Sequence, residues 1–304
     1  MNRRKFPQST LVAGLGIAAG SSLFAQPGAV APHSFNLNYA PHLGMFKNMA
    51  GDDPIEQLNV TADQGFTAFE DNNMNTRPIA LQEKMAATMR KRNLTMGVFV
   101  AYKDFRNPTL ASGKGDARQD FLDQIKTAVP VAKRVNAKWV TVVPGTVDLK
   151  LVEDYQTANV IESLKQASAI LEPHGIVMVL EPLNWYRNHA GLFLKESPQA
   201  FQICRAVNSP ACKILFDIYH QQIQEGNLIP NIEKCWDEIA YFQIGDNPGR
   251  KEPTTGEINY KNIFKYIHSR DFTGVMGMEH GNSRPDKAGE LAVINAYKEV
   301  DSFL

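Results

Sequence analysis

Hydrophobic and polar positions follow two alternating patterns along the chain. Short runs of apolar, β-branched and aromatic residues, typical of buried strands, are separated by longer segments with apolar residues at helical spacing. This order predicts repeated strand–helix units. Eight strands are predicted, at residues 34–40, 68–71, 94–100, 138–145, 176–182, 213–218, 240–246 and 274–280.

The segments between these strands are predicted to be helical, for example residues 54–65, 80–93, 118–136, 153–175 and 263–272. Eight such units over about 270 residues are the size of a (β/α)8 TIM barrel. The alternative, a doubly wound sheet with a second domain, would place GxGxxG after the first strand, and NYAPHLGMF lacks that spacing. No linker or internal repeat divides the chain, so we expect a single α/β barrel domain.

The first 25 residues have a different pattern. MNRRKF precedes LVAGLGIAAGSSLFA, an apolar and small-residue run that is too short to span a bilayer and resembles the core of an export signal. Arg3 and Arg4 indicate the twin-arginine route, which carries folded proteins. We predict a signal at residues 1–25, cleavage near Ala25, a barrel domain at 26–304, and a periplasmic protein without membrane attachment after cleavage. A disordered tail with chance arginines is the alternative.

Composition narrows the classes of partner. The chain has 32 basic and 32 acidic residues, so no global field favours nucleic acid or an anionic membrane. The chain has an odd number of cysteines and no CxxC pair, which argues against a disulfide framework. The three are Cys204, Cys212 and Cys235. We expect buried free thiols, with a Cys204–Cys212 bridge as the alternative in an oxidising compartment.

Polar side chains stand at the ends of the last four predicted strands. Glu181, Asp217 and Glu279 directly follow apolar strand residues, and Gln243 and Asp246 end the seventh strand. The carboxyl ends of barrel strands meet at one mouth, where burying an unpaired carboxylate is costly. A shared cation offsets that cost, and three carboxylates with an amide oxygen suit Mg²⁺ or Mn²⁺. The alternative for any one of them is capping of a neighbouring loop.

Two of these acids could also carry chemistry. If Glu181 and Glu279 face each other across the mouth, one can remove a proton beside a carbonyl and the other can return it. A metal that chelates the carbonyl and its neighbouring hydroxyl stabilises the intervening enediolate. The predicted result is isomerisation or epimerisation.

Further polar residues follow the same strand ends within nine positions. A histidine there could orient a ligand or bind a substrate oxygen, and a guanidinium suits a carboxylate or polyol. A helix-start histidine and solvated surface charges are the alternatives. The predicted substrate-facing residues are His220, Arg250, Asn184, Glu252 and Asp246.

Four sequence motifs in this order resemble the hydroxypyruvate isomerase family within the xylose-isomerase-like barrel superfamily: LEPLN, FDIYHQQIQEG, QIGDNPGRKEPTTGEINY and GMEH. The resemblance implies that Glu181 and Glu279 form the acid/base pair and that His220 and Arg250 face the substrate. The metal ligands that it implies are Glu181, Asp217, Gln243 and Glu279. Two segments differ from that family, EHGNSRP after the last glutamate and WYRNHAGLFL after EPLN. The reaction class therefore transfers better than the substrate.

The sequence thus predicts a divalent-metal-dependent isomerase or epimerase of a small ketose, keto acid or related sugar. A lyase or dehydratase acting on an oxidised sugar would use the same barrel, and a non-catalytic periplasmic sugar-binding protein is a further alternative. An apurinic endonuclease would need a His-rich metal cluster and a basic surface, whereas the seven histidines are scattered and the net charge is zero. Homo-oligomer formation is left open.

Overall fold

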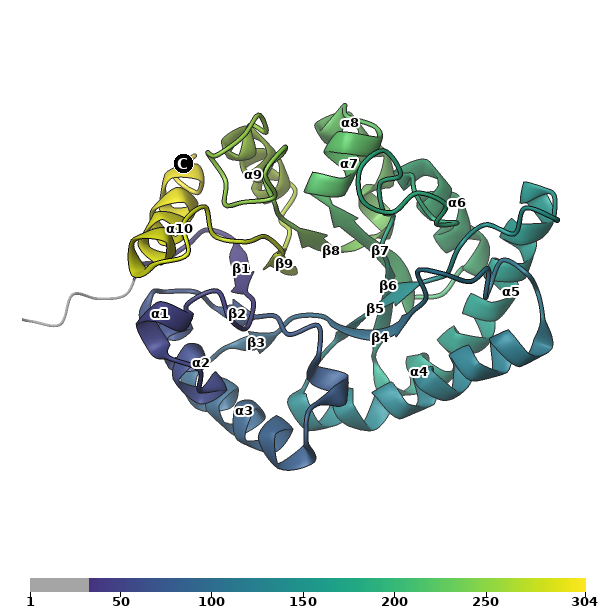
Figure 1. Ribbon diagram of the computed structural model, residues 1–304, viewed down its shortest axis with the longest axis horizontal. Coiled ribbons are helices and arrows are strands. Elements are labelled where there is room, and N and C mark those ends of the chain that lie inside the picture. Colours follow the sequence, from purple (N-terminus) through teal and green to yellow (C-terminus); the bar gives the residue numbers. More distant parts are fainter. Residues whose placement is uncertain (1–32) are drawn as a thin grey trace, which may run out of the picture. The chain divides into compact units, whose positions relative to one another are not determined.

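The computed structural model describes residues 33–304, and the predicted export signal lies outside them. Strands and helices alternate along this part of the chain, with the strands at the centre and the helices around them (Figure 1). All eight predicted strands are present. The strands are β1 (Asn38–Pro41), β2 (Ala68–Phe69), β3 (Thr95–Met96), β4 (Phe99–Lys103), β5 (Trp139–Val143), β6 (Val177–Leu180), β7 (Cys212–Asp217), β8 (Ile239–Gln243) and β9 (Val275–Met278).

The helices also follow the predicted order, with boundaries shifted by a few residues. Asp53 caps the first long helix by accepting the backbone N–H of Ile55, and Pro54 occupies the first turn. The helices are α1 (Lys47–Ala50), α2 (Pro54–Asp63), α3 (Ile79–Arg92), α4 (Gly115–Val135), α5 (Glu153–Leu171), α6 (Ser197–Val207), α7 (Ile218–Gln224), α8 (Leu228–Cys235), α9 (Tyr260–Ser269) and α10 (Lys287–Val300), with short 3₁₀ turns η1 (Met74–Thr76), η2 (Glu172–His174) and η3 (Trp236–Glu238).

The strands pair in parallel as a closed ring. Seven of them form a sheet in the order β1-β9-β8-β7-β6-β5-β4, and β2 pairs with β3. A parallel bridge between His42 and Glu70 joins the ends of β1 and β2, and the N–H of Val100 in β4 donates to the carbonyl of Asn72 at 3.2 Å. The β2–β3 pair therefore lies between β1 and β4, which confirms the predicted (β/α)8 TIM barrel.

The third predicted strand is interrupted at Gly97, between β3 and β4. A Cβ at this glycine would lie 2.4 Å from the hydroxyl oxygen of Tyr241, and that hydroxyl also contacts the N–H of Val98 at 3.4 Å. The backbone therefore approaches a side chain from the opposite wall of the barrel, and only glycine leaves room for it.

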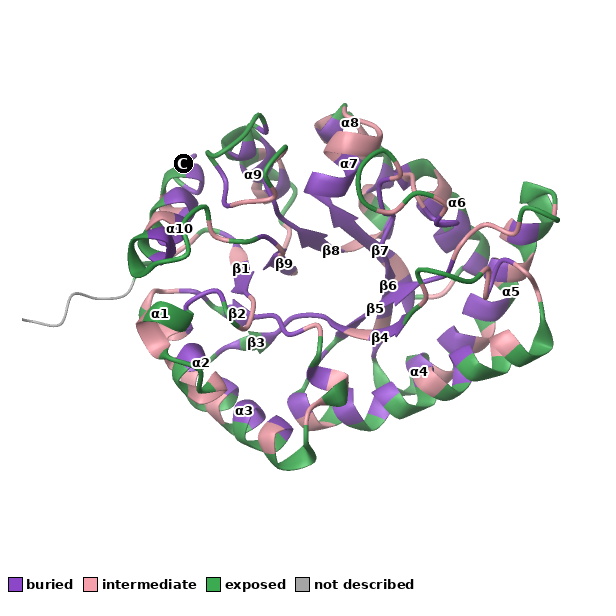
Figure 2. Cartoon of the chain, viewed as in Figure 1, coloured by how far each residue is buried: buried purple, intermediate pink, exposed green. Residues whose placement is uncertain are grey.

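The core has two layers. One large apolar cluster fills the space between strands and helices, so the strands are buried while the outer helix faces are exposed (Figure 2). A smaller cluster fills the barrel itself, and each barrel strand supplies one side chain to it. Its buried members are Ala40, Ala68, Val98, Trp139, Val179, Leu215, Tyr241 and Val275.

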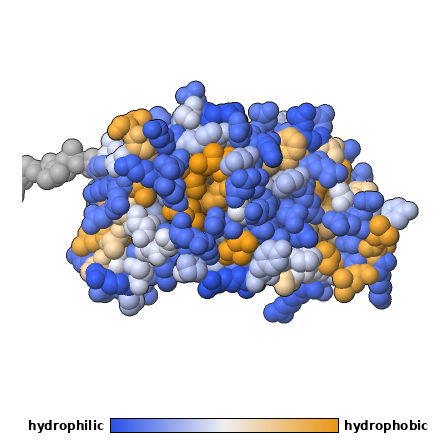
Figure 3. Space-filling view, turned by 90° about the horizontal axis from the view of Figure 1, so that it is seen from above, coloured by the Kyte–Doolittle hydropathy of each residue, from blue (hydrophilic) through white to orange (hydrophobic). Residues whose placement is uncertain are grey.

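Hydrophilic side chains cover most of the face shown in Figure 3, and hydrophobic ones form separate patches among them. Within residues 33–304, no helix has the length and apolar character needed to cross a membrane. Cys204, Cys212 and Cys235 are buried free thiols, as predicted.

Candidate active site at the carboxyl ends of the strands

The four predicted metal ligands lie at neighbouring strand ends. Glu181 directly follows β6, Asp217 ends β7, Gln243 ends β8 and Glu279 directly follows β9. Asp217 is the register partner of Gln243, and Gln243 is the partner of Gly277. The first and last acids, Glu181 and Glu279, line one cavity of about 160 Å³. The alternation of strands and helices has thus brought residues nearly 100 positions apart to one mouth.

Asp217 has two functions in the local structure. It ends β7 and also caps α7, because its Oδ1 accepts the backbone N–H of His220 at 3.0 Å. The cap turns His220 back toward the strand end, where its Nε2 lies 3.7 Å from Asp217 Oδ2. Carboxyl or imidazole atoms of Glu181, Asp217 and His220 all lie within 4.8 Å of one another, close enough to share a cation.

The hydrogen bonds around Asn184 determine which ring nitrogen of His220 carries the proton. Asn184 Oδ1 accepts the N–H groups of Arg187 and Asn188, both at 3.1 Å, so its Nδ2 must face the imidazole. That Nδ2 lies 2.6 Å from His220 Nδ1. Because burial lowers the pKa of His220 well below its usual value, the ring is neutral, Nδ1 accepts and Nε2 bears the hydrogen.

The buried Nε2 of His220 has no hydrogen-bond partner within residues 33–304. A nitrogen that carries hydrogen cannot ligate a metal, although His220 lies close enough to do so. His220 is therefore placed to donate a hydrogen bond to a substrate oxygen. Asn184 is fully buried and orients His220, instead of lining the cavity itself.

Arg250 connects two of the acids. Its Nη2 donates to Glu279 Oε2 at 2.8 Å and lies 3.5 Å from Asp217 Oδ2. The other oxygen of Glu279 accepts the side-chain amide of Asn72 at 3.1 Å. The guanidinium also stands 4.9 Å from the centre of the Tyr219 ring. Arg250 lines the cavity and its charge is already paired with carboxylates, and its predicted contact with substrate stays a prediction.

The loop that carries Arg250 is held by the two remaining predicted residues. The carboxylate of Asp246 accepts the N–H groups of Gly256 at 2.8 Å and Ile258 at 3.1 Å. The carboxylate of Glu252 binds Ser283, accepting its N–H at 2.8 Å. Both acids are buried and lie outside the cavity lining. The structure thus places them as supports of the loop, and direct substrate contact by either stays a prediction.

Glu70 belongs to the site although the sequence analysis did not single it out. It follows β2, is fully buried, and accepts hydrogen bonds from Tyr241 Oη at 2.8 Å and Gln243 Nε2 at 3.0 Å. The amide of Gln243 is thereby held with its nitrogen toward Glu70, and its buried Oε1 has no partner in the described chain. A Cβ at Gly277 would lie 1.9 Å from Glu70 Oε2, so this glycine makes room for the carboxyl.

Electrostatics at the mouth favour a cation. Burial, followed by the charges of Glu279 and Asp217, raises the pKa of Glu181 well above its usual value. Burial likewise raises the pKa of Asp217 and of Glu279, although Arg250 opposes both shifts, and raises the pKa of Glu70 to about 8. Several carboxyls therefore crowd one buried volume and oppose each other's ionisation.

Of the predicted ligands, Glu181 and Asp217 offer oxygen atoms within 4.8 Å of each other, and the chemistry of the full predicted set suits a hard divalent ion. Glu181, Asp217 and Glu279 offer carboxylate oxygens, and the unpartnered Oε1 of Gln243 offers a neutral one. A divalent cation would neutralise the mutual repulsion of the acids and supply the missing partner of the buried amide oxygen. Oxygen ligands of this kind suit Mg²⁺ or Mn²⁺.

Other cavity-lining residues were missed by the sequence analysis. They lie in or just after the second to fourth strands of the barrel and in the loop after β6. One of them is Thr141, whose buried hydroxyl has no hydrogen-bond partner in the described chain. Extending the strand-end rule to the first half of the barrel would have found Glu70 and most of these. They include Asn72, Lys103, Phe105, Thr141 and His189.

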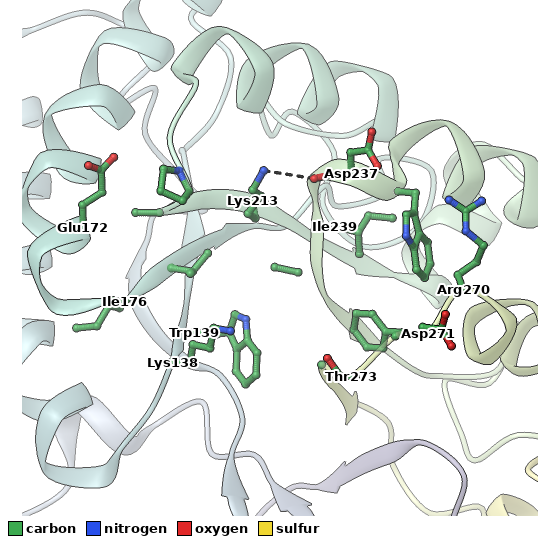
Figure 4. A pocket seen from close by; sticks show the side chains of 18 residues that line it. Lys138, Trp139, Glu172, Ile176, Lys213, Asp237, Ile239, Arg270, Asp271 and Thr273 are labelled. Atoms are coloured by element: carbon green, nitrogen blue, oxygen red, sulfur yellow. Dashed lines mark hydrogen bonds between the residues drawn. The ribbon is translucent and has the colours of Figure 1, made fainter.

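A larger cavity of about 760 Å³ lies at the opposite, amino-terminal ends of the strands. Figure 4 shows charged side chains of both signs around it, such as Lys138, Lys213, Arg270, Glu172 and Asp271. Lys213 is already bound, with its Nζ 3.3 Å from the carbonyl of Asp237. Barrels place their chemistry at the carboxyl ends, so the smaller cavity with its clustered acids is the candidate active site.

Comparison with known proteins identifies the family of the barrel. A family model described as "Xylose isomerase-like TIM barrel" matches residues 58–298. Hydroxypyruvate isomerase from Escherichia coli is 32% identical over 171 residues, which cover 56% of this chain and 66% of that protein, slightly less than two thirds of its length.

Two further proteins are similar over more of the chain. The 2-oxo-tetronate isomerase of Pectobacterium atrosepticum is 29% identical over 232 residues, which cover 74% of this chain and 86% of that protein. A crystal structure described as AP endonuclease, family 2, from Brucella melitensis is 27% identical, with a TM-score of 0.72, and covers 86% of this chain and 99% of that one.

Proposed function

Because the chain belongs to the xylose isomerase-like TIM barrel family, we propose that it is a divalent-metal-dependent isomerase or epimerase of a small ketose, keto acid or related sugar. The observation that carries this proposal is the meeting of Glu181 and Glu279, from β6 and β9, in the lining of one cavity. The similarity to hydroxypyruvate isomerase and 2-oxo-tetronate isomerase supports the reaction class.

In this proposal Glu181, Asp217, Gln243 and Glu279 hold the cation. When bound there, Mg²⁺ or Mn²⁺ would supply electrophilic stabilisation of negative charge on a substrate carbonyl and its neighbouring hydroxyl. Glu70 orients Gln243 so that the amide presents oxygen and not nitrogen. Arg250 holds Glu279 in place and balances its charge.

The two glutamates transfer the proton. Burial raises the pKa of both in the metal-free protein, and in this proposal each carboxylate can accept a proton from carbon. One removes the proton from the carbon beside the carbonyl, and the electron pair of the broken C–H bond moves onto the carbonyl oxygen to give an enediolate. The other returns a proton to carbon. Isomerisation results when the former carbonyl carbon receives it and the proton of the neighbouring hydroxyl passes to the former carbonyl oxygen, so that the carbonyl is now at the neighbouring carbon. Epimerisation results when the original carbon receives it on the opposite face. The Nε2–H of His220 is available to the oxygen on which charge develops.

Single Glu181→Gln and Glu279→Gln substitutions test this proposal. Each should lower kcat by about 10²–10⁴-fold, because an amide cannot accept the proton. Proton NMR in D₂O should show deuterium entering the substrate carbon with the metal-loaded protein and not with the variants. Glu83→Gln, on the exposed side of α3, serves as the control. A protein without bound divalent metal and without solvent exchange into any ketose or keto acid contradicts the proposal.

The same experiment separates the alternatives. A lyase or dehydratase would give a product that has lost a leaving group, which NMR identifies directly. A non-catalytic binder would show no turnover, and its ligand affinity would be nearly unchanged in both variants. For an endonuclease, the group of close metal-binding side chains found in residues 33–304 contains only one histidine, which does not favour a His-rich cluster.

We also propose that residues 1–25 direct export through the twin-arginine route and that the mature barrel is periplasmic. Arg3 and Arg4, followed by an apolar run, support this proposal. Replacing both arginines by lysine should retain the protein in the cytoplasmic fraction. Unchanged secretion of this variant, measured by cell fractionation, would reject the route.

A further inference from the structure

We infer that Lys103 binds the carboxylate of the substrate and thereby directs the enzyme toward hydroxy-keto acids over neutral sugars. This inference rests on the proposed function, because it concerns the same cavity. The observation behind it is that Lys103 and Arg250 are the cationic side chains among the described residues that line the cavity beside Glu181 and Glu279.

The positive charge of Arg250 already faces two acids of the site. Its guanidinium donates to Glu279 Oε2 at 2.8 Å and to the Glu279 carbonyl at 3.3 Å, and it lies 3.5 Å from Asp217. An anion on Arg250 would compete with these carboxylates and would approach them closely. Arg250 therefore balances the charge of the acids.

The histidines of the cavity do not supply a free positive charge. His220 is held by Asn184 at Nδ1 and its Nε2 lies 3.7 Å from Asp217, and the ring centre of His189 lies 5.3 Å from that of His220. Neither ring carries the permanent charge that a lysine offers to an anion.

Lys103, by contrast, forms no ion pair within residues 33–304. It ends β4, its side chain is exposed, and no carboxylate of residues 33–304 lies within ion-pair distance of its Nζ. Its recorded contact is with the Phe105 ring, 5.8 Å from Nζ to the ring centre. Lys103 lines the cavity while its side chain stays exposed to solvent, so its ammonium group is available to a substrate anion.

A second group in the same cavity indicates a polar ligand. The hydroxyl of Thr141, on the neighbouring strand β5, is buried and has no hydrogen-bond partner in the described chain. A ligand whose carboxylate meets Lys103 could give an oxygen to Thr141 while its carbonyl end points toward the acids. A cavity of about 160 Å³ fits a short hydroxy acid better than a long oligosaccharide.

Equilibrium binding tests this inference without turnover. Titration calorimetry of the metal-loaded protein should show D-glycerate binding about tenfold or more tightly than glycerol, because an ion-paired hydrogen bond is lost with the neutral ligand. Lys103→Met should remove this difference, and Lys103→Arg should retain most of it. Lys138→Met, a lysine of the opposite cavity, should bind like the unaltered protein.

Kinetics give a second readout. For hydroxypyruvate, Lys103→Met should raise KM about tenfold or more with kcat little changed, while a neutral ketose should be unaffected. Preserved glycerate selectivity in Lys103→Met overturns the inference. Tighter binding of glycerol 3-phosphate than of glycerate overturns the assignment to a carboxylate. If glycerate binds through Lys103 but no ketose or keto acid is converted, the proposed isomerase function fails while the assignment of Lys103 to a ligand carboxylate stands.

Discussion

His220 and Gln243 show how single hydrogen bonds decide which atoms face the mouth of the barrel. Asn184 fixes the imidazole so that Nε2 bears hydrogen, and Glu70 fixes the amide so that Oε1 is left free. Both orienting residues are fully buried. One neighbour thus leaves His220 with a free donor and the other leaves Gln243 with a free acceptor oxygen, although either side chain could have presented its other atom.

His220→Leu tests the tautomer. Because Nε2–H is a donor, the variant should lose about 10²-fold or more in kcat/KM and should bind divalent metal as the unaltered protein does. Asp217→Asn should instead weaken metal binding. Metal affinity is measured by calorimetry on chelator-stripped protein. A large loss of metal affinity in His220→Leu would show that the imidazole is a ligand.

Glu70 offers a matched pair of substitutions. Glu70→Met removes the acceptor for Gln243 Nε2, so the amide is free to turn and divalent-metal affinity should fall about 10–100-fold. Glu70→Gln keeps an acceptor oxygen at the same place and should bind metal nearly as well as the unaltered protein. Equal affinities for both variants, again measured by calorimetry, would exclude an orienting role.

Several helices of the barrel end at an asparagine whose backbone conformation stops the helix. Helices α3, α4 and α6 end at Asn93, Asn136 and Asn208, each in the left-handed conformation with φ 54°. Asparagine tolerates this conformation better than other residues with a side chain, apart from glycine. These caps turn each helix toward its next strand, and thereby set the position of the strand ends that form the site.

The interruption between β3 and β4 leads to a prediction about the stability of the fold. Gly97→Ala should destabilise the fold by about 1–3 kcal/mol, because its Cβ would lie 2.4 Å from the Tyr241 hydroxyl, which also binds Glu70. Gly115→Ala, at an open position in the first turn of α4, should be neutral or slightly stabilising. Urea unfolding compares the two. Equal stability of both variants would contradict the predicted crowding.

For the whole molecule, the buried acids predict a pH dependence of stability in the absence of metal. The pKa of Glu70 is raised from 4.5 to about 8 by burial. The folded state therefore holds this proton more tightly than the unfolded chain, and stability is lost as pH rises through about 8. The histidines with lowered pKa values act in the opposite direction, but below their usual value of 6.5.

Urea unfolding in EDTA between pH 7 and pH 9 measures this effect. The free energy of unfolding should fall across the window in the unaltered protein and should fall less in Glu70→Gln, which has no proton to lose. Added Mg²⁺ or Mn²⁺ should stabilise the protein more at the higher pH, because the ion binds deprotonated carboxylates. Identical slopes for both proteins would assign the titration to other groups.

The sequence by itself determined the order of strands and helices, the barrel, and the polar residues at the last four strand ends. These depend on local pattern: hydrophobic period distinguishes strand from helix, and a carboxylate directly after an apolar strand marks a functional end. For Glu181, Asp217, Gln243 and Glu279, chain order was enough to predict that they lie at neighbouring strand ends.

Only the tertiary structure decided how these residues are oriented and paired. Glu70 and Gln243 are 173 positions apart, and Arg250 and Glu279 are 29 apart, so no local pattern indicates either hydrogen bond. The tautomer of His220 and the uncommitted charge of Lys103 likewise depend on which side chains approach from other strands. Hydrophobic pattern acts through neighbours along the chain, whereas hydrogen bonds and charges act through neighbours in space.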